Sequence, residues 1–208
     1  MTDTRLRGLY AITDEQLIPE ADFAAIIEQA LQGGTSIIQY RDKSNDSGKR
    51  RQQAGILREL CSRYSALLVI NDDIELAKAV GADGVHLGED DAAIEQARSV
   101  LGYQAVIGIS CYNQLERAVE AEAAGADYVA FGAMFNSPTK PQARSASYDL
   151  IHQAKARLDI PVCAIGGIDG HNAAGVIVSG ADMVALISGL FSEADIALTA
   201  KYISGLFD

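Results

Sequence analysis

Eight short apolar runs recur along the chain, and their composition is typical of strands buried on both faces. They are rich in Val and Ile and occupy residues 8–13, 36–41, 66–71, 84–88, 105–110, 128–134, 161–167 and 183–188. Continuous apolar runs of this length, without polar alternation, indicate strands of a parallel sheet that is covered by helices. Segments with helical spacing of apolar residues separate the runs.

Residues 22–31 show the clearest helical pattern, because their apolar positions recur at intervals of three and four. Residues 48–64 repeat the pattern, with Leu57 and Cys61 on the apolar face. Strand–helix alternation of this kind, eight times over, predicts an α/β protein with a single (β/α)8 TIM-barrel domain over residues 1–208. A doubly wound sheet is the alternative, but no G-x-G-x-x-G follows the first run.

An internal repeat supports this organisation. The triplet Gly-Ala-Asp occurs three times between a helical segment and an apolar run, at 81–83, 125–127 and 180–182. Glycine just past a helix end supplies the left-handed conformation that closes the last turn. We interpret the three aspartates as structural turn residues that precede strands.

Composition narrows the classes of function. The 208 residues are 49% apolar, and the formal net charge is −11, which disfavours a nucleic-acid-binding protein. No apolar stretch is long enough to span a bilayer, and the N-terminus lacks the apolar region of a signal peptide. We therefore expect a cytoplasmic protein that binds neither membrane nor nucleic acid. Three widely spaced cysteines argue against a disulfide framework and against a zinc site.

Polar residues follow the apolar runs, at the end of a barrel where active sites are built. At the end of the second run, side-chain alternation places Gln39, Arg41 and Lys43 on one face and Tyr40 and Asp42 on the other. Arg offers a bidentate fork to phosphate and Lys offers a mobile point charge, so we interpret this face as an anion grip. A solvated strand end is the alternative. A further cation in the loop after the sixth run could reach the same anion; it is Lys140.

Acidic residues follow the third and fourth runs, at neighbouring strand ends. Carboxylates together with phosphate oxygens are typical ligands of Mg²⁺. We favour Asp72 and Asp91 as the metal ligands, and interpret Asp73, Glu89 and Asp90 as surface or helix N-terminal acids. Spacing alone does not decide among the five.

The last two runs end in glycine and serine, in the sequences AIGGI and ALISG. Backbone N–H groups at these ends of a barrel commonly hold a phosphate monoester, although ordinary tight turns would have the same composition. The mouth is thus expected to hold two anions, a diphosphate and a monophosphate. His86 is interpreted as a hydrogen-bonded core histidine, with a catalytic residue as the alternative. Cys111 is interpreted as a packing or pocket-wall residue, with a nucleophile as the alternative.

Eight short motifs occur in one order along nearly the whole chain: LYAITD, QYRDK, INDD, GADGVHLGEDD, GIS, SPTK, AIGGI and ALISG. Together they resemble the thiamine phosphate synthase family. The resemblance implies a transferase of thiamine biosynthesis that joins 4-amino-2-methyl-5-(diphosphooxymethyl)pyrimidine to a thiazole phosphate, or its carboxylated tautomer. Pyrophosphate is released, and one Mg²⁺ per subunit is required.

The resemblance also assigns the site residues. It implies that the pyrimidine diphosphate is bound by Gln39, Tyr40, Arg41, Asp42, Lys43, Asn71, Ser110 and Lys140. Within this set it gives catalytic roles to Arg41, Lys43, Ser110 and Lys140. The implied ligands of the thiazole phosphate are Ser137, Pro138, Thr139, Gly167, Ile187 and Ser188, and those of Mg²⁺ are Asp72 and Asp91.

Two other functions fit the same barrel. A thiazole tautomerase would need no diphosphate grip, and Tyr112 stands where a histidine would be expected for it. A non-catalytic regulator that binds thiazole phosphate would need neither the cations nor the metal pair. Pyrophosphate release separates the three functions. The sequence leaves a homodimer open.

Overall fold

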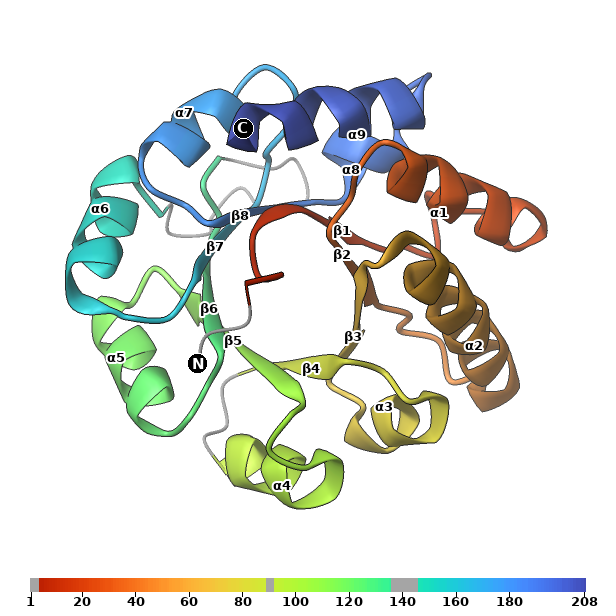
Figure 1. Cartoon of the computed structure of the whole chain (residues 1–208), viewed down its shortest axis with the longest axis horizontal. Helices are drawn as coiled ribbons and strands as arrows, with labels where there is room; N and C mark the ends of the chain where they lie inside the picture. The colour runs from red at the N-terminus through yellow and green to blue at the C-terminus, as the bar shows by residue number, and fades with distance from the viewer. Residues whose placement is uncertain (1–3, 89–91, 136–145) are drawn as a thin grey trace.

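The computed structural model describes residues 4–88, 92–135 and 146–208. Its eight parallel strands pair in chain order, and β8 pairs with β1, so that the sheet closes into a barrel surrounded by helices (Figure 1). The predicted (β/α)8 fold is therefore confirmed. The strands are β1 (Gly8–Ile12), β2 (Ile37–Tyr40), β3 (Leu67–Asn71), β4 (Gly84–Leu87), β5 (Val106–Tyr112), β6 (Tyr128–Phe131), β7 (Val162–Ile165) and β8 (Met183–Leu186).

Helices follow the strands and cover the outside of the barrel. They are α1 (Phe23–Gln32), α2 (Ser47–Tyr64), α3 (Ile74–Val80), α4 (Ala92–Leu101), α5 (Leu115–Ala123), α6 (Tyr148–Arg157), α7 (Ala173–Val178), α8 (Ser188–Phe191) and α9 (Ile196–Ser204), with short 3-10 helices η1 (Glu20–Asp22) and η2 (Gly205–Phe207). No helix in the described part of the chain is both long and apolar enough to cross a membrane.

Alternation along each strand divides the buried side chains into two layers. In β1, Leu9 and Ala11 pack against the helices, whereas Tyr10 and Ile12 point into the barrel. The inner layer carries a large aromatic side chain from β6, that of Tyr128. A Cβ at Gly108 would lie 2.0 Å from Cζ of Tyr128, so only glycine leaves room for this ring.

The aspartates of the Gly-Ala-Asp triplets join neighbouring strands where those strands begin. The amide of Asp83 donates to the carbonyl of Leu68 at 2.9 Å, and the Asp83 carboxylate accepts from the Leu68 amide at 2.8 Å. The same carboxylate oxygen pairs with Arg58 of α2 at 2.7 Å. We call this arrangement, an aspartate bound to one residue of the preceding strand and to a basic side chain, a carboxylate clamp.

The clamp recurs at the start of β6 and of β8. It joins Asp127 to Ile107 and Arg98, and Asp182 to Val162 and Lys155. The structural interpretation of the three aspartates is thereby confirmed. Each clamp satisfies a backbone N–H group that the apolar interior would otherwise leave without an acceptor.

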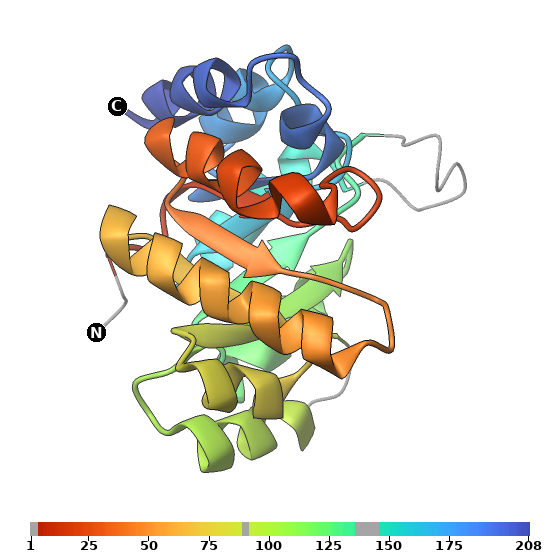
Figure 2. The same ribbon diagram turned by 90° about the vertical axis from the view of Figure 1, so that its right-hand side faces the viewer.

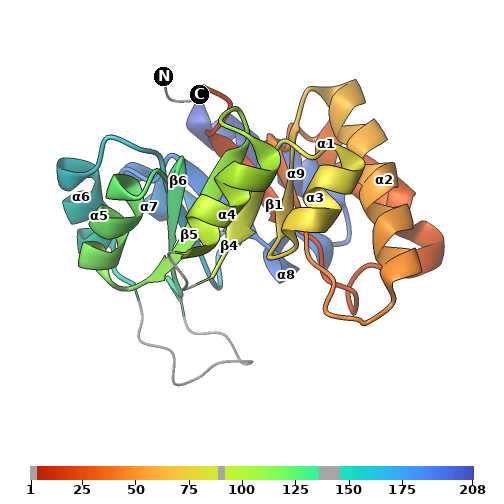
Figure 3. The same ribbon diagram turned by 90° about the horizontal axis from the view of Figure 1, so that it is seen from below.

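The loops that follow the strands lie at one end of the barrel. Figure 2 shows the arrowhead of β2 pointing to this end, whereas the C-terminus lies at the other. In Figure 3, α8 lies at the lower side of the barrel as drawn, which is the same end. This end is the mouth at which barrel enzymes build their sites.

Candidate active site

Five polar side chains form a continuous hydrogen-bonded chain across the barrel interior. Gln39 donates from Nε2 to the Tyr10 hydroxyl at 2.7 Å, and the hydroxyls of Tyr10 and Tyr128 lie 2.8 Å apart. The Tyr128 hydroxyl lies 2.9 Å from Nδ1 of His86, and Nε2 of His86 lies 2.9 Å from Oγ of Ser110. We call this set the interior chain. It connects two residues that the family resemblance assigns to the pyrimidine diphosphate, Gln39 and Ser110.

Burial keeps the middle of the interior chain uncharged. It lowers the pKa of His86 to about 4 and raises the pKa of Tyr10 and of Tyr128 well above 10. At neutral pH His86 is therefore a neutral imidazole, with one nitrogen that donates and one that accepts. The interpretation of His86 as a hydrogen-bonded core histidine agrees with this geometry.

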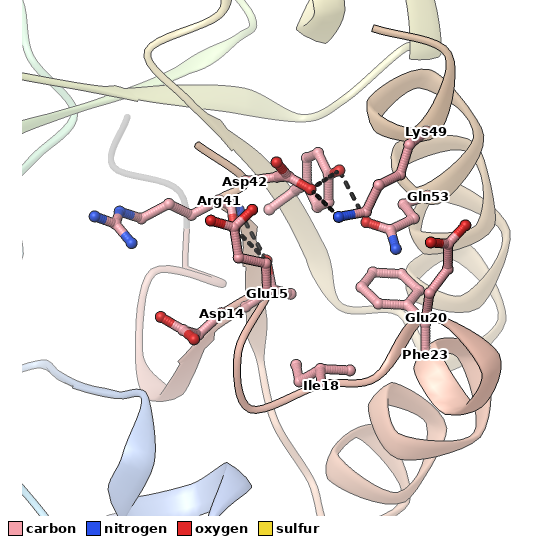
Figure 4. Close-up of a pocket in the computed structure, with 11 residues that line it drawn as sticks. Asp14, Glu15, Ile18, Glu20, Phe23, Arg41, Asp42, Lys49 and Gln53 are labelled. Atoms are coloured by element: carbon pink, nitrogen blue, oxygen red, sulfur yellow. Dashed lines mark hydrogen bonds and ion pairs between the residues drawn. The ribbon is translucent and has the colours of Figure 1, made fainter. Parts of the chain in front are cut away.

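The backbone after β2 is fixed against the end of β1. The amide of Arg41 donates to Oγ1 of Thr13 at 2.8 Å, and this hydroxyl donates to the Arg41 carbonyl at 3.1 Å. The Arg41 guanidinium extends away from the neighbouring pair of Asp42 and Lys49 (Figure 4). The loop therefore leaves this cation available for an anion at the mouth.

Asp42 points away from the barrel interior and organises the loop that carries Arg41 and Lys43. Its side chain is 2% exposed, pairs with Lys49 at 2.8 Å and accepts from the Ser44 amide at 2.6 Å. Burial alone would raise the pKa of this carboxyl, but the hydrogen bonds from Lys49 and Ser44 hold its pKa well below the usual range. Asp42 is thus a charged anchor for the loop.

Tyr40 also lies in the outer layer, as the alternation predicts. Its hydroxyl donates to Oε1 of Gln53 at 3.0 Å, and its ring contacts Phe23 edge to face. The predicted contacts of Tyr40 and Asp42 with substrate would therefore have to come from their backbone. A small pocket lies here, outside the barrel, lined by Thr13, Asp14, Glu15, Ile18, Glu20, Phe23, Tyr40, Arg41, Asp42, Lys49 and Gln53 (Figure 4). Its volume of about 160 Å³ is below the roughly 300 Å³ of typical ligand pockets, so it is not the substrate site by itself.

The end of β3 presents a carboxylate to solvent. Asp72 is exposed, has a left-handed backbone with φ of 60°, and accepts from Nδ2 of Asn71 at 2.7 Å. Its backbone amide donates to the carbonyl of His86 at 2.9 Å, which holds it beside β4. An exposed, oriented carboxylate next to a carboxamide is suited to Mg²⁺, which prefers oxygen ligands.

The next acid has a structural role. Asp73 caps α3 by accepting from the Leu76 amide at 2.9 Å, and it pairs with Arg50 at 2.7 Å. Its interpretation as a helix N-terminal acid is confirmed. Within 4–88, 92–135 and 146–208, no group of three or more His, Cys, Asp or Glu side chains is arranged as a metal site. The other candidate acids, Glu89, Asp90 and Asp91, lie outside the described residues.

Two glycines follow β7 in conformations that other residues rarely adopt. Gly166 and Gly167 have φ of 102° and 65°, and the Gly167 carbonyl accepts from Nδ2 of Asn172 at 2.9 Å. Ile187 follows β8, and Ser188 is the exposed first residue of α8. The first backbone N–H groups of a helix have no acceptor within the helix. These strand ends have the backbone and hydroxyl donors that a phosphate needs. The remaining predicted ligands lie outside the described residues: Ser137, Pro138, Thr139 and Lys140.

Sequence reasoning missed the two tyrosines of the interior chain. Tyr10 and Tyr128 lie on the inward face of their strands and are 1% and 0% exposed. A buried tyrosine hydroxyl needs a hydrogen-bond partner. Polar residues at inward positions of four other strands were therefore the feature of the sequence that could have indicated these two tyrosines. Those residues are Gln39, His86 and Ser110, from β2, β4 and β5, and Asn71, from β3.

Fold and site together define a (β/α)8-barrel enzyme whose polar groups gather where the strands end. The chain belongs to the thiamine monophosphate synthase family, whose model matches residues 9–190. The predicted family is confirmed, and with it the prediction of a transferase of thiamine biosynthesis.

Curated relatives share about half of the sequence over its whole length. The thiamine-phosphate synthase of Thioalkalivibrio sulfidiphilus is 51% identical, with all of both chains covered. That of Nitrosococcus oceani is 53% identical over 94% of this chain and 90% of its own. Among solved structures, thiamine phosphate pyrophosphorylase from Pyrococcus furiosus matches with a TM-score of 0.89 and 35% identity, covering 99% of this chain and 98% of that one. A 3-hexulose-6-phosphate synthase, 16% identical with a TM-score of 0.71, shares the fold alone.

Proposed function

We propose that this chain condenses 4-amino-2-methyl-5-(diphosphooxymethyl)pyrimidine with 4-methyl-5-(2-phosphoethyl)thiazole, or its carboxylated tautomer, and releases pyrophosphate. The observation that carries the proposal is the position of Gln39, Asn71, Asp72 and Ser110, which lie at or next to the ends of β2, β3 and β5. The full-length similarity to synthases supports it.

In the proposed mechanism, cations stabilise the leaving group. Arg41, Lys43 and Lys140 would bind the diphosphate and neutralise the negative charge that grows as the C–O bond to pyrophosphate breaks. Asp72 and Asp91 would hold Mg²⁺, which adds positive charge beside the same oxygens when it is bound. The thiazole phosphate would lie against Ser137, Pro138, Thr139, Gly167, Ile187 and Ser188.

The reacting carbon is the methylene attached to the aminopyrimidine. The electron-rich ring stabilises positive charge at this carbon, and Gln39 would orient the ring through its exocyclic amino group. The thiazole nitrogen then attacks the methylene. No protein nucleophile is needed, which agrees with the burial of Cys61, Cys111 and Cys163 and with the pKa of Cys61, raised by burial to about 12.

Pyrophosphate release with both purified substrates tests the proposal. A synthase releases pyrophosphate only when both are present, whereas a tautomerase converts the carboxylated thiazole phosphate alone, and a regulator binds thiazole phosphate without turnover. Absence of pyrophosphate with both substrates and Mg²⁺ would overturn the proposed function.

A matched pair of variants tests the metal ligand. Asp72→Ala should abolish most activity at limiting Mg²⁺ and leave the fold intact, because its carboxylate is exposed. Asp159→Ala, an exposed acid at the start of the loop before β7, is the control and should behave like the original protein. Unchanged Mg²⁺ dependence in Asp72→Ala would remove this residue from the metal site. A cytoplasmic location and a homodimer stay predictions from the sequence.

A further inference from the structure

We infer that Tyr10, Tyr128 and His86 are positioning residues that hold Gln39 as a hydrogen-bond acceptor and Ser110 as a donor toward the pyrimidine diphosphate. The inference rests on the proposed function, because it takes Gln39 and Ser110 to be ligands of that substrate. The three positioning residues would not touch the reacting atoms. They would act by fixing the direction of every hydrogen bond in the interior chain.

The direction follows from the donor at one end. The Gln39 amide nitrogen donates to Tyr10 at 2.7 Å, so the Tyr10 hydrogen is free for the Tyr128 oxygen 2.8 Å away. The Tyr128 hydroxyl then donates to Nδ1 of His86 at 2.9 Å. A neutral imidazole that accepts at Nδ1 carries its proton on Nε2, which donates to Ser110 at 2.9 Å.

Both ends of the interior chain are thereby defined. The side-chain nitrogen of Gln39 donates a hydrogen to the Tyr10 hydroxyl. The side-chain oxygen of Gln39 is then left to accept from an exocyclic amino group. The Ser110 oxygen accepts from His86, which leaves its hydrogen to be donated to an anionic oxygen or a ring nitrogen. Each bond polarises the next, so the chain favours one direction throughout.

Packing alone does not account for these residues. Tyr10 and Tyr128 are embedded among Ile12, Ile37, Leu67, Val69, Val106 and Met183, where phenylalanine would pack equally well. A buried hydroxyl without a partner is costly, and the nearest partner of each is another member of the interior chain. The glycine at position 108 leaves the space that the Tyr128 ring occupies.

A mutant cycle tests whether Tyr10 acts through Gln39. Tyr10→Phe should weaken the binding of pyrimidine diphosphate about tenfold, the effect of one neutral hydrogen bond, as measured by calorimetry. In a Gln39→Ala background the same change should alter affinity less than twofold. Tyr103→Phe, at a side chain that is 90% exposed, is the matched control. Affinity for the thiazole phosphate should stay constant throughout. An equal loss with and without Gln39 would mean that Tyr10 acts only through packing, and would overturn the inference.

Nitrogen NMR of the His86 ring tests the direction without relying on substrate. The proton is expected on Nε2, and Tyr128→Phe should shift the signal of the bare Nδ1 while leaving the proton in place. The signals are assigned by their loss in His86→Gln. A proton on Nδ1 would show that the interior chain runs in the opposite direction and would overturn the inference. If the original protein and Tyr103→Phe both fail to bind pyrimidine diphosphate, the proposed function is wrong, and the NMR result still decides the direction.

Discussion

Removal of one carboxylate clamp should destabilise the barrel measurably. Asp182→Ala takes the acceptor from the Val162 amide, which lies 2.7 Å from the carboxylate, and removes the ion pair with Lys155 at 2.7 Å. Asp182→Asn keeps an oxygen in nearly the same place and removes only the charge. Comparing the two variants separates the backbone hydrogen bond from the ion pair.

The magnitude follows from the burial of each partner. Val162 is 0% exposed, so its unpaired amide should cost about 1–3 kcal/mol. The ion pair is partly exposed, with side chains 35% and 29% accessible, and should contribute about 0–1 kcal/mol. We expect Asp182→Ala to lower the free energy of unfolding by about 2–3 kcal/mol, and Asp182→Asn by about 1 kcal/mol or less.

Thermal unfolding followed by circular dichroism measures the difference. For a chain of this size, each kcal/mol corresponds to about 2–4 °C, so the midpoint of Asp182→Ala should fall by about 4–12 °C. Pyrophosphate release at 25 °C should be unchanged, because the clamp lies where β8 begins and the mouth lies where it ends. The reasoning is refuted if Asp182→Ala and Asp182→Asn unfold at the same temperature.

Three further changes have defined outcomes. Gly108→Ala would place a Cβ 2.0 Å from the Tyr128 ring. It should therefore lower the free energy of unfolding, measured in urea, by about 1–3 kcal/mol. An unchanged free energy of unfolding would mean that the Tyr128 ring can move aside. Burial holds the pKa of His86 at about 4 in the folded protein, against 6.5 in the unfolded chain. Between these two values the unfolded state binds more protons, so the free energy of unfolding should fall by about 3 kcal/mol from pH 7 to pH 4. His86→Gln should lack this part of the pH dependence. Asp42→Asn removes the charge that anchors the loop through Lys49, and should lower kcat/KM for the pyrimidine diphosphate several-fold without changing the KM for thiazole phosphate; equal effects on both substrates would argue against a local role.

Local sequence patterns were sufficient to predict the barrel. Covered parallel strands appear as continuous apolar runs, and each of the eight runs overlaps one strand of the structure. The ends of the runs were less certain. The sixth run was predicted to extend to residue 134, but β6 ends at Phe131, since apolar residues after a strand can pack without extending it. β5 continues beyond the fifth run to Tyr112. Tyr112 has a left-handed backbone with φ of 54°, and the pattern of apolar residues does not predict such a conformation.

The side chains of the site were predictable only in part. Alternation correctly separated the inward Gln39 from the outward Tyr40, because it depends on local geometry alone. The interior chain was not predictable in the same way. Its central contact joins Tyr10 to a residue 118 positions away, and which inward side chains meet depends on the register around the closed barrel.

The carboxylate clamps divide the molecule into segments that could be exchanged. Each clamp ties two successive strands to the helix before them, so one segment runs from α2 to β4, the next from α4 to β6 and the third from α6 to β8. The loops after β4 and β6 separate these three segments, the loops after β2 and β8 flank them, and none of the three clamps joins one segment to another. These same loops hold most of the residues that the family resemblance assigns to substrate and metal. Circular permutation or loop grafting at these junctions would leave every clamp whole, which gives the barrel a route to new substrates without loss of its framework.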